Sequence, residues 1–167
     1  KVFQQEKISK KKMILYLFGT FGPLTVVDSS TNGKDLFLKT LESLKKVENA
    51  FIIIKPHPNT DPIELENLIQ KTKMTNISIS MMHPSVLATF CQFAISNYFS
   101  LSIVDAWLVG LRTIEFSQYE PKLLRITNNH SIQPEYIDNF LQLHEGGKLI
   151  KILNSSIKPK KRNFQAN

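Results

Sequence analysis

The sequence contains a single cysteine, Cys91, and no apolar run long enough to span a membrane. One cysteine excludes an intrachain disulfide and favours a reducing compartment. Because Cys91 lies within an apolar stretch, we expect a packed and unreactive thiol. The first residues are basic and lack the apolar core of a signal peptide. Together these features predict a cytoplasmic protein.

Metal-binding spacing is also lacking in the sequence. The histidines His57, His83, His130 and His144 show no zinc-like spacing to one another or to Cys91. We therefore expect no metal site and no metal cofactor. The chain also has no internal repeat, so a repeat architecture is not expected.

The positive charge of the chain is concentrated at its two ends. The formal net charge is +7, but residues 1–12 hold five lysines and one glutamate, and residues 158–167 hold three lysines and one arginine. These tails sum to +8 and leave −1 for the residues between them. We therefore predict basic tails at 1–12 and 158–167 and one domain at 13–157. The near-neutral domain argues against nucleic acid as a partner, whereas the tails suit weak contact with an anionic inner membrane face.

Hydrophobic periodicity predicts strands that alternate with helices. Strands are expected at residues 13–18, 50–55, 77–81, 94–97 and 113–116. Helices are expected at residues 35–46, from 61 onward, at 84–93, from 100 or 102 to 110, from 134 through 141, and after the glycine pair 146–147. Five strands separated by helices imply right-handed crossovers, and hence an α/β fold with a Rossmann-like parallel sheet flanked by helices.

The second predicted strand ends in an unusual turn, Ile52-Ile53-Ile54-Lys55-Pro56-His57-Pro58. Three consecutive β-branched residues fit a strand buried on both faces, and the prolines force the chain out of the sheet at its carboxyl end. Open α/β sheets bind ligands at that edge. Lys55 offers a positive charge there and His57 a ring that can donate to an anion. We therefore interpret this turn as a phosphate site, although His57 could instead satisfy carbonyl groups of its loop.

A second candidate region starts the helix after the fourth strand. Ser100 and Ser102 add hydroxyl donors to a helix start, where free N–H groups and the helix dipole favour a phosphate. Asp105, one turn further, could accept hydrogen bonds from ribose hydroxyls. The pattern from Ser102 to Asp105 also fits a capping box, which needs no ligand.

Two further segments supply weaker candidates. Gly19 and Gly22 follow the first strand and could let the backbone approach a ligand, although such a pair is more often only a turn. Glu115 lies inside the fifth strand. Glu120 follows that strand and could contact sugar hydroxyls, with ordinary solvent exposure as the alternative.

The succession IIIKPHP and then FAISNYFSLSIVDAWLVGLRTIEF resembles the C-terminal, donor-binding half of GT-B glycosyltransferases over about residues 13–120. It is most similar to capsular and lipooligosaccharide sialyltransferases and to CDP-glycerol glycerophosphotransferases, which carry a His-Pro motif followed by a Ser-rich motif. The resemblance implies that His57 is the catalytic residue on the nucleotide phosphate and that Ser100 and Ser102 contact the same phosphates. Asp105 matches the acidic position on the donor-site helix.

The resemblance implies a nucleotide-sugar donor, CMP-, CDP- or UDP-linked, used in surface polysaccharide biosynthesis. Lys55, His57 and the helix start at Ser100 would hold the nucleoside phosphate leaving group. In that family the acceptor site lies in an N-terminal domain, so an acceptor domain or a partner chain is expected. Two alternatives stay open: an enzyme similar to the sugar-nucleotide 2-epimerases, which would need an acid and base pair within the chain, and a non-catalytic flavodoxin-like binding module.

Overall fold

The computed structural model describes residues 11–21 and 32–155. Most of the two predicted basic tails, and Gly22, therefore lie outside the described residues. The strands are β1 (Lys12–Phe18), β2 (Ala50–Pro56), β3 (Ile77–Ile79), β4 (Phe93–Ser96), β5 (Arg112–Ser117) and β6 (Asn139–Gln142). The helices are α2 (Gly33–Leu44), α3 (Pro62–Thr72), α4 (Pro84–Ala88), α5 (Leu101–Leu108), α6 (Pro121–Ile126) and α7 (Gly146–Asn154), with 3-10 turns η1 (Pro134–Tyr136) and η2 (Leu143–Glu145).

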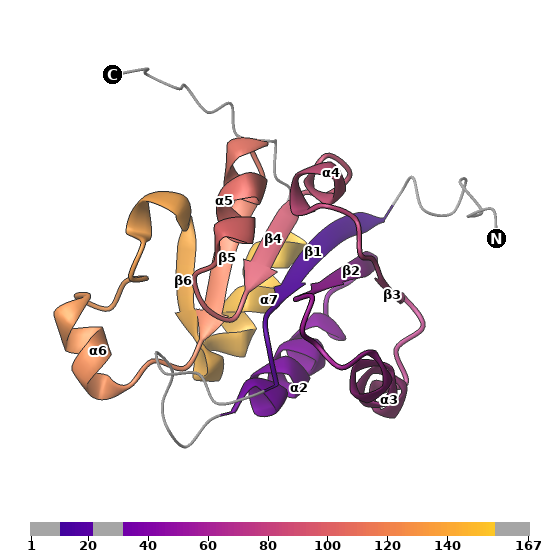
Figure 1. Cartoon of the computed structure of the whole chain (residues 1–167). Helices are drawn as coiled ribbons and strands as arrows, with labels where there is room; N and C mark the ends of the chain where they lie inside the picture. Colours follow the sequence, from indigo (N-terminus) through magenta and orange to yellow (C-terminus); the bar gives the residue numbers. More distant parts are fainter. Residues whose placement is uncertain (1–10, 22–31, 156–167) are drawn as a thin grey trace.

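All six strands pair in parallel, in the order β3-β2-β1-β4-β5-β6. The predicted Rossmann-like parallel sheet is confirmed, with six strands rather than five. The chain moves outward from β1 to β3, crosses back to β4 beside β1, and then moves outward in the other direction (Figure 1). The boundary between β1 and β4 is therefore the topological switch point of the sheet.

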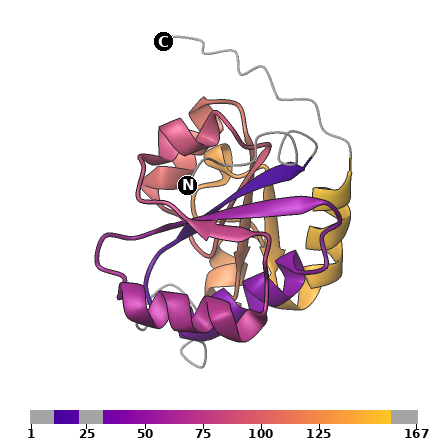
Figure 2. The same ribbon diagram turned by 90° about the vertical axis from the view of Figure 1, so that its right-hand side faces the viewer.

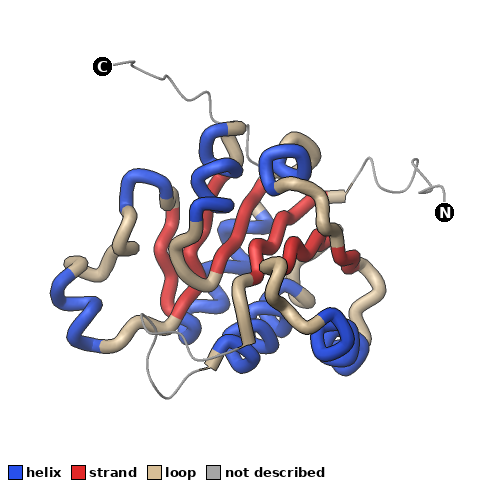
Figure 3. Tube along the Cα trace, in the orientation of Figure 1, coloured by secondary structure: helices blue, strands red, loops and turns tan. Residues whose placement is uncertain are grey.

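Helices cover both faces of the sheet, as the two orthogonal views and the red strands between blue helices show (Figures 2 and 3). Side chains of β1 alternate between the two faces, because successive residues of a strand point in opposite directions. Ile14 and Tyr16 pack with α2, α3 and α7, whereas Leu15 and Leu17 pack with α4 and α5. All four are almost completely buried, so β1 is the centre of both core layers.

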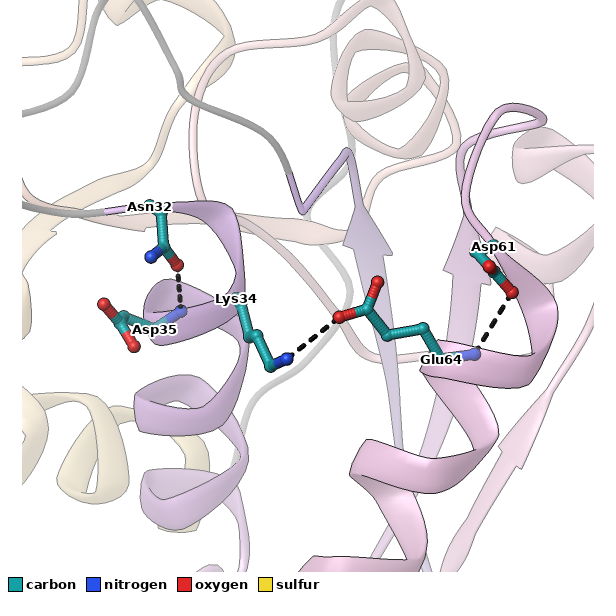
Figure 4. Close-up of polar contacts among 5 residues, drawn as sticks. All are labelled: Asn32, Lys34, Asp35, Asp61 and Glu64. Carbon is teal, nitrogen blue, oxygen red and sulfur yellow. Dashed lines mark hydrogen bonds and ion pairs between the residues drawn. The ribbon is translucent and has the colours of Figure 1, made fainter.

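Helices α2 and α3 begin side by side at the carboxyl edge of the sheet (Figure 4). Asn32 caps α2 by accepting from the Asp35 backbone N–H at 2.9 Å, and Asp61 caps α3 by accepting from the Glu64 backbone N–H at 3.2 Å. The start of this helix at residue 61 was expected from the sequence. An ion pair of 2.9 Å between Lys34 Nζ and Glu64 Oε1 joins the two first turns. Both partners are partly exposed, so the pair contributes at most about 1 kcal/mol.

The helix predicted for residues 134–141 does not form. Residues 134–136 form the 3-10 turn η1, and residues 139–142 form the edge strand β6, which pairs with β5. Phe140 packs its ring against Tyr119 with a centroid separation of 4.8 Å, and Leu141 is buried. These tertiary contacts outweigh the local helical spacing of the apolar residues.

Two other predicted boundaries were also wrong. The helix expected at 84–93 ends at Ala88. The backbone N–H of Gln92 already donates to the Met13 carbonyl, and Phe93 begins β4, which pairs with both β1 and β5. The glycine pair 146–147 does not break the chain before the last helix, since α7 begins at Gly146 directly after η2.

Candidate functional site

The carboxyl ends of β1, β2 and β4 surround a cavity of about 290 Å³ at the switch point of the sheet. Its lining combines apolar strand ends with polar loop residues: Leu17, Phe18, Gly19, Lys55, Pro56, His57, Pro58, Tyr98, Ser100 and Ser102. Five residues predicted as site candidates from three separate segments of the sequence thus line one pocket: Gly19, Lys55, His57, Ser100 and Ser102.

The turn after β2 supplies the cationic wall of this pocket. Lys55 is half-buried and donates from Nζ to the Pro56 carbonyl at 2.7 Å, which holds its charge close to the turn. His57 is exposed, and its Nδ1 accepts from the Asn59 backbone N–H at 3.2 Å. A neutral ring with an accepting Nδ1 carries its proton on Nε2. His57 therefore keeps Nε2 as a donor for a ligand.

Gly19 lies where three loops meet. Its carbonyl accepts from Thr60 Oγ1 at 2.9 Å, which connects the β1 loop to the β2 loop. A Cβ atom at Gly19 would lie 1.4 Å from the Tyr98 hydroxyl oxygen, so only glycine lets the Tyr98 ring approach this closely. Burial of the Tyr98 ring raises the pKa of its hydroxyl. Gly19 thus provides close packing between β1 and the β4 loop. Nothing in the sequence pattern points to Tyr98 as a pocket residue.

The start of α5 forms the opposite wall. Ser100 is the N-cap residue in an extended conformation, and its side chain makes no capping hydrogen bond. The alternative that Ser102 caps the helix is therefore wrong, because Ser102 lies inside the first turn of α5. The backbone N–H of Ile103 bonds the Ser100 carbonyl at 3.0 Å, and the N–H groups before it have no intrahelical acceptor. This helix start offers backbone donors and two hydroxyls to an anion.

A buried polar network fixes the loop between β4 and α5. Asn97 is 2% exposed, and its Nδ2 donates to Thr40 Oγ1 at 2.8 Å and to the Phe116 carbonyl at 2.9 Å. Its Oδ1 accepts from the Tyr16 hydroxyl. Burial raises the pKa of Tyr16. Asn97 therefore ties the loop to β1, α2 and β5. Its local sequence does not indicate this role, because all its partners are distant along the chain.

Asp105 and Glu120 do not line the pocket. Asp105 is half-buried in the middle of α5. Glu120 is the N-cap residue of α6 after β5, half-buried and without a side-chain capping bond. The structure thus does not bring these two carboxylates together with the residues at β1, β2 and β4.

Glu115 on β5 is fully buried on the face of the sheet that α5 covers. The Tyr119 hydroxyl donates to Oε1 and the Ser131 hydroxyl to Oε2, each at 2.5 Å. Burial raises the pKa of the Glu115 carboxyl against the opposing effect of these two hydrogen bonds. The network joins the segment around α6 to the sheet and lies outside the pocket lining.

Cys91 is half-buried, and burial raises the pKa of its thiol to about 12. Within residues 11–21 and 32–155, no group of three or more His, Cys, Asp or Glu side chains is placed to hold a metal ion. None of the helices in the described part of the chain is long and apolar enough to cross a membrane. The chain matches no protein-family model and no curated protein.

Proposed function

We propose that the pocket binds the nucleoside phosphate part of a nucleotide sugar, CMP-, CDP- or UDP-linked, and that the chain is the donor-binding part of a GT-B-type glycosyltransferase of surface polysaccharide assembly. One observation carries this proposal. The end of β2 and the start of α5, which the sequence predicts to bind phosphate, line a single pocket with Gly19 at the switch point of a parallel sheet.

The donor groups suit an anion that gains charge during the reaction. In sugar transfer, the bond between the anomeric carbon and the phosphate oxygen breaks, and the electron pair leaves with the phosphate. The charge of Lys55, the Nε2 proton of His57 and the start of α5 at Ser100 would stabilise that charge. His57 is the residue for which we propose a catalytic role, through its contact with the leaving phosphate.

The size of the cavity fits part of a donor molecule. A volume of about 290 Å³ is at the lower end of the range for small-molecule sites, about 300 to 1,000 Å³. The pocket would hold phosphate and ribose, while the transferred sugar faces outward. An acceptor domain or partner chain would then supply the acceptor and the base that removes its proton.

Calorimetry with CMP, CDP and UDP, each with and without a chelator, tests this proposal. We expect weak binding that does not need a divalent cation, because basic side chains and a helix start replace the metal. His57→Ala should weaken binding by about 1.5 to 3 kcal/mol, the value of a charge-assisted hydrogen bond. The melting temperature should change little, since His57 is exposed. His130→Ala, at an exposed histidine outside the pocket lining, is the matched control.

Absence of binding for all three nucleotides would refute the donor-site proposal, and strict dependence on magnesium would refute its metal-free form. Equal losses in the His57 and His130 variants would show that the turn after β2 is only structural. Conversion of a UDP-sugar to its 2-epimer by the chain alone would favour the epimerase alternative over sugar transfer.

A further inference from the structure

The edge of the sheet opposite the pocket gathers positive charge. In a parallel sheet each strand starts at this amino edge, and each helix that returns between strands ends there. Basic side chains at or near these strand starts and helix ends are Lys11, Lys12, Lys45, Lys46, Lys71, Lys73, Arg112 and Lys151. They outnumber the acidic residues placed there in the same way, which are Glu42, Glu48, Asp105, Glu135 and Asp138.

The two ends of the described fold meet at this amino edge. Lys12 at the start of β1 donates from Nζ to Asn154 Oδ1 at the end of α7, at 3.3 Å. The sequences that precede Lys11 and follow Ser155 are therefore joined to the fold at the same edge. The segments 1–12 and 158–167, which contain or follow these two ends in the sequence, together carry +8.

Large apolar side chains are exposed at the same edge. Phe90 follows α4 and is 62% exposed, while Leu108 and Val109 end α5 and are 45% and 43% exposed. Helices α4 and α5 pack against each other, so their ends are neighbours. Exposed apolar groups beside a basic surface are typical of proteins that bind at the surface of an anionic bilayer.

We infer that this amino edge docks on an anionic lipid bilayer, with the lysines facing the headgroups and Phe90, Leu108 and Val109 entering the interface. A nucleic acid would match the cations but leave these apolar side chains in water, so the bilayer explains more of the surface. In this orientation the pocket at the carboxyl edge faces away from the bilayer. The inference does not depend on what the pocket binds.

A single tryptophan at the amino edge can report on insertion. In the full 167-residue chain, Trp107→Phe removes the one native tryptophan, and Phe90→Trp then places a reporter at this edge. Ile63→Trp in the same background is the control, because Ile63 is 71% exposed at the start of α3, on the opposite edge. The vesicles contain phosphatidylcholine and phosphatidylglycerol with brominated acyl chains, which quench nearby tryptophan.

We expect quenching and a blue shift for the reporter at position 90 and neither for the reporter at position 63. Vesicles of phosphatidylcholine alone should produce no quenching of either. Equal quenching of the two reporters, or no quenching of the reporter at position 90, would overturn the inference. Calorimetry with nucleotide on the same variants tests the proposed donor site separately, so failure of vesicle binding can be distinguished from failure of nucleotide binding.

The contribution of the lysines at the amino edge to vesicle binding is tested with two matched double variants. Lys46→Gln with Lys151→Gln removes two exposed charges at the amino edge, and Lys39→Gln with Lys122→Gln removes two exposed charges elsewhere. We expect the edge pair to weaken vesicle binding about fivefold per lysine and the control pair to have a much smaller effect. Equal losses of vesicle binding in the two double variants, or tighter binding to duplex DNA than to vesicles, would refute the anionic bilayer as the partner of this edge.

Discussion

The contact between Gly19 and Tyr98 yields the sharpest quantitative test of the site. Gly19→Ala adds one methyl group, and its carbon would lie 1.4 Å from the Tyr98 hydroxyl oxygen, 2.3 Å from Cζ and 2.9 Å from Cε1. Non-bonded atoms cannot approach one another this closely, so either the Tyr98 ring or the loop that carries Gly19 must move. Overpacking of this kind costs about 1 to 3 kcal/mol. A domain of this size loses about 2 to 4 °C in melting temperature per kcal/mol.

A double-mutant cycle measured by urea denaturation isolates this clash from other effects of the substitution. Tyr98→Ala removes the ring, so Gly19→Ala should cost almost nothing in that background. Tyr98→Phe removes only the oxygen and leaves Cζ within 2.3 Å, so it should relieve part of the cost. Both residues line the pocket, and we therefore expect Gly19→Ala to weaken nucleotide binding as well. An equal cost of Gly19→Ala with and without the Tyr98 ring would refute the close contact.

Two further predictions concern the buried polar groups. Asn97→Ala leaves the Thr40 hydroxyl and the Phe116 carbonyl without their amide donor and should cost at least about 1 to 3 kcal/mol in urea denaturation, whereas a change within about 0.5 kcal/mol would contradict the network. Because burial raises the pKa of Glu115, its stabilising contribution should be complete below the ordinary value of 4.5 and lost as the pH rises through the raised pKa. Melting curves over this range should therefore show a stability that falls with pH in the native chain and less so in Glu115→Gln; identical slopes would exclude Glu115 as the cause.

The central part of the sheet was predictable because its strands are buried on both faces. Such strands appear as continuous apolar runs, as in residues 13–18 and 50–54, and these runs contain no competing helical pattern. The strand β6 was not predictable in the same way. It has four residues at the sheet edge, and the spacing of Ile137, Phe140 and Leu141 fits a helix equally well. Only the packing of Phe140 on Tyr119 and the pairing with β5 decide the outcome.

The convergence of Lys55, His57 and Ser100 could be expected because parallel strands bring all their carboxyl ends to one edge. The residues that shape the pocket were harder to foresee. Tyr98 packs its ring against Gly19, and the Asn97 amide bonds to buried groups on other strands and on α2. The local sequence around these two residues predicts neither contact. Glu115 was placed in its strand, but its two hydroxyl partners depend on how the later chain folds over the sheet.

The central position of β1 also has a consequence for the order in which the chain folds. During synthesis β1, β2 and β3 emerge first and can pair, while the side of β1 that later pairs with β4 stays open. That open side carries unpaired backbone groups beside the apolar residues Ile14, Leu15 and Tyr16, which is a template for association with other chains. The risk ends only when residues 93–96 have emerged and closed the β1 edge. The strand whose carboxyl end lines the pocket is therefore also the one through which an incomplete chain would aggregate.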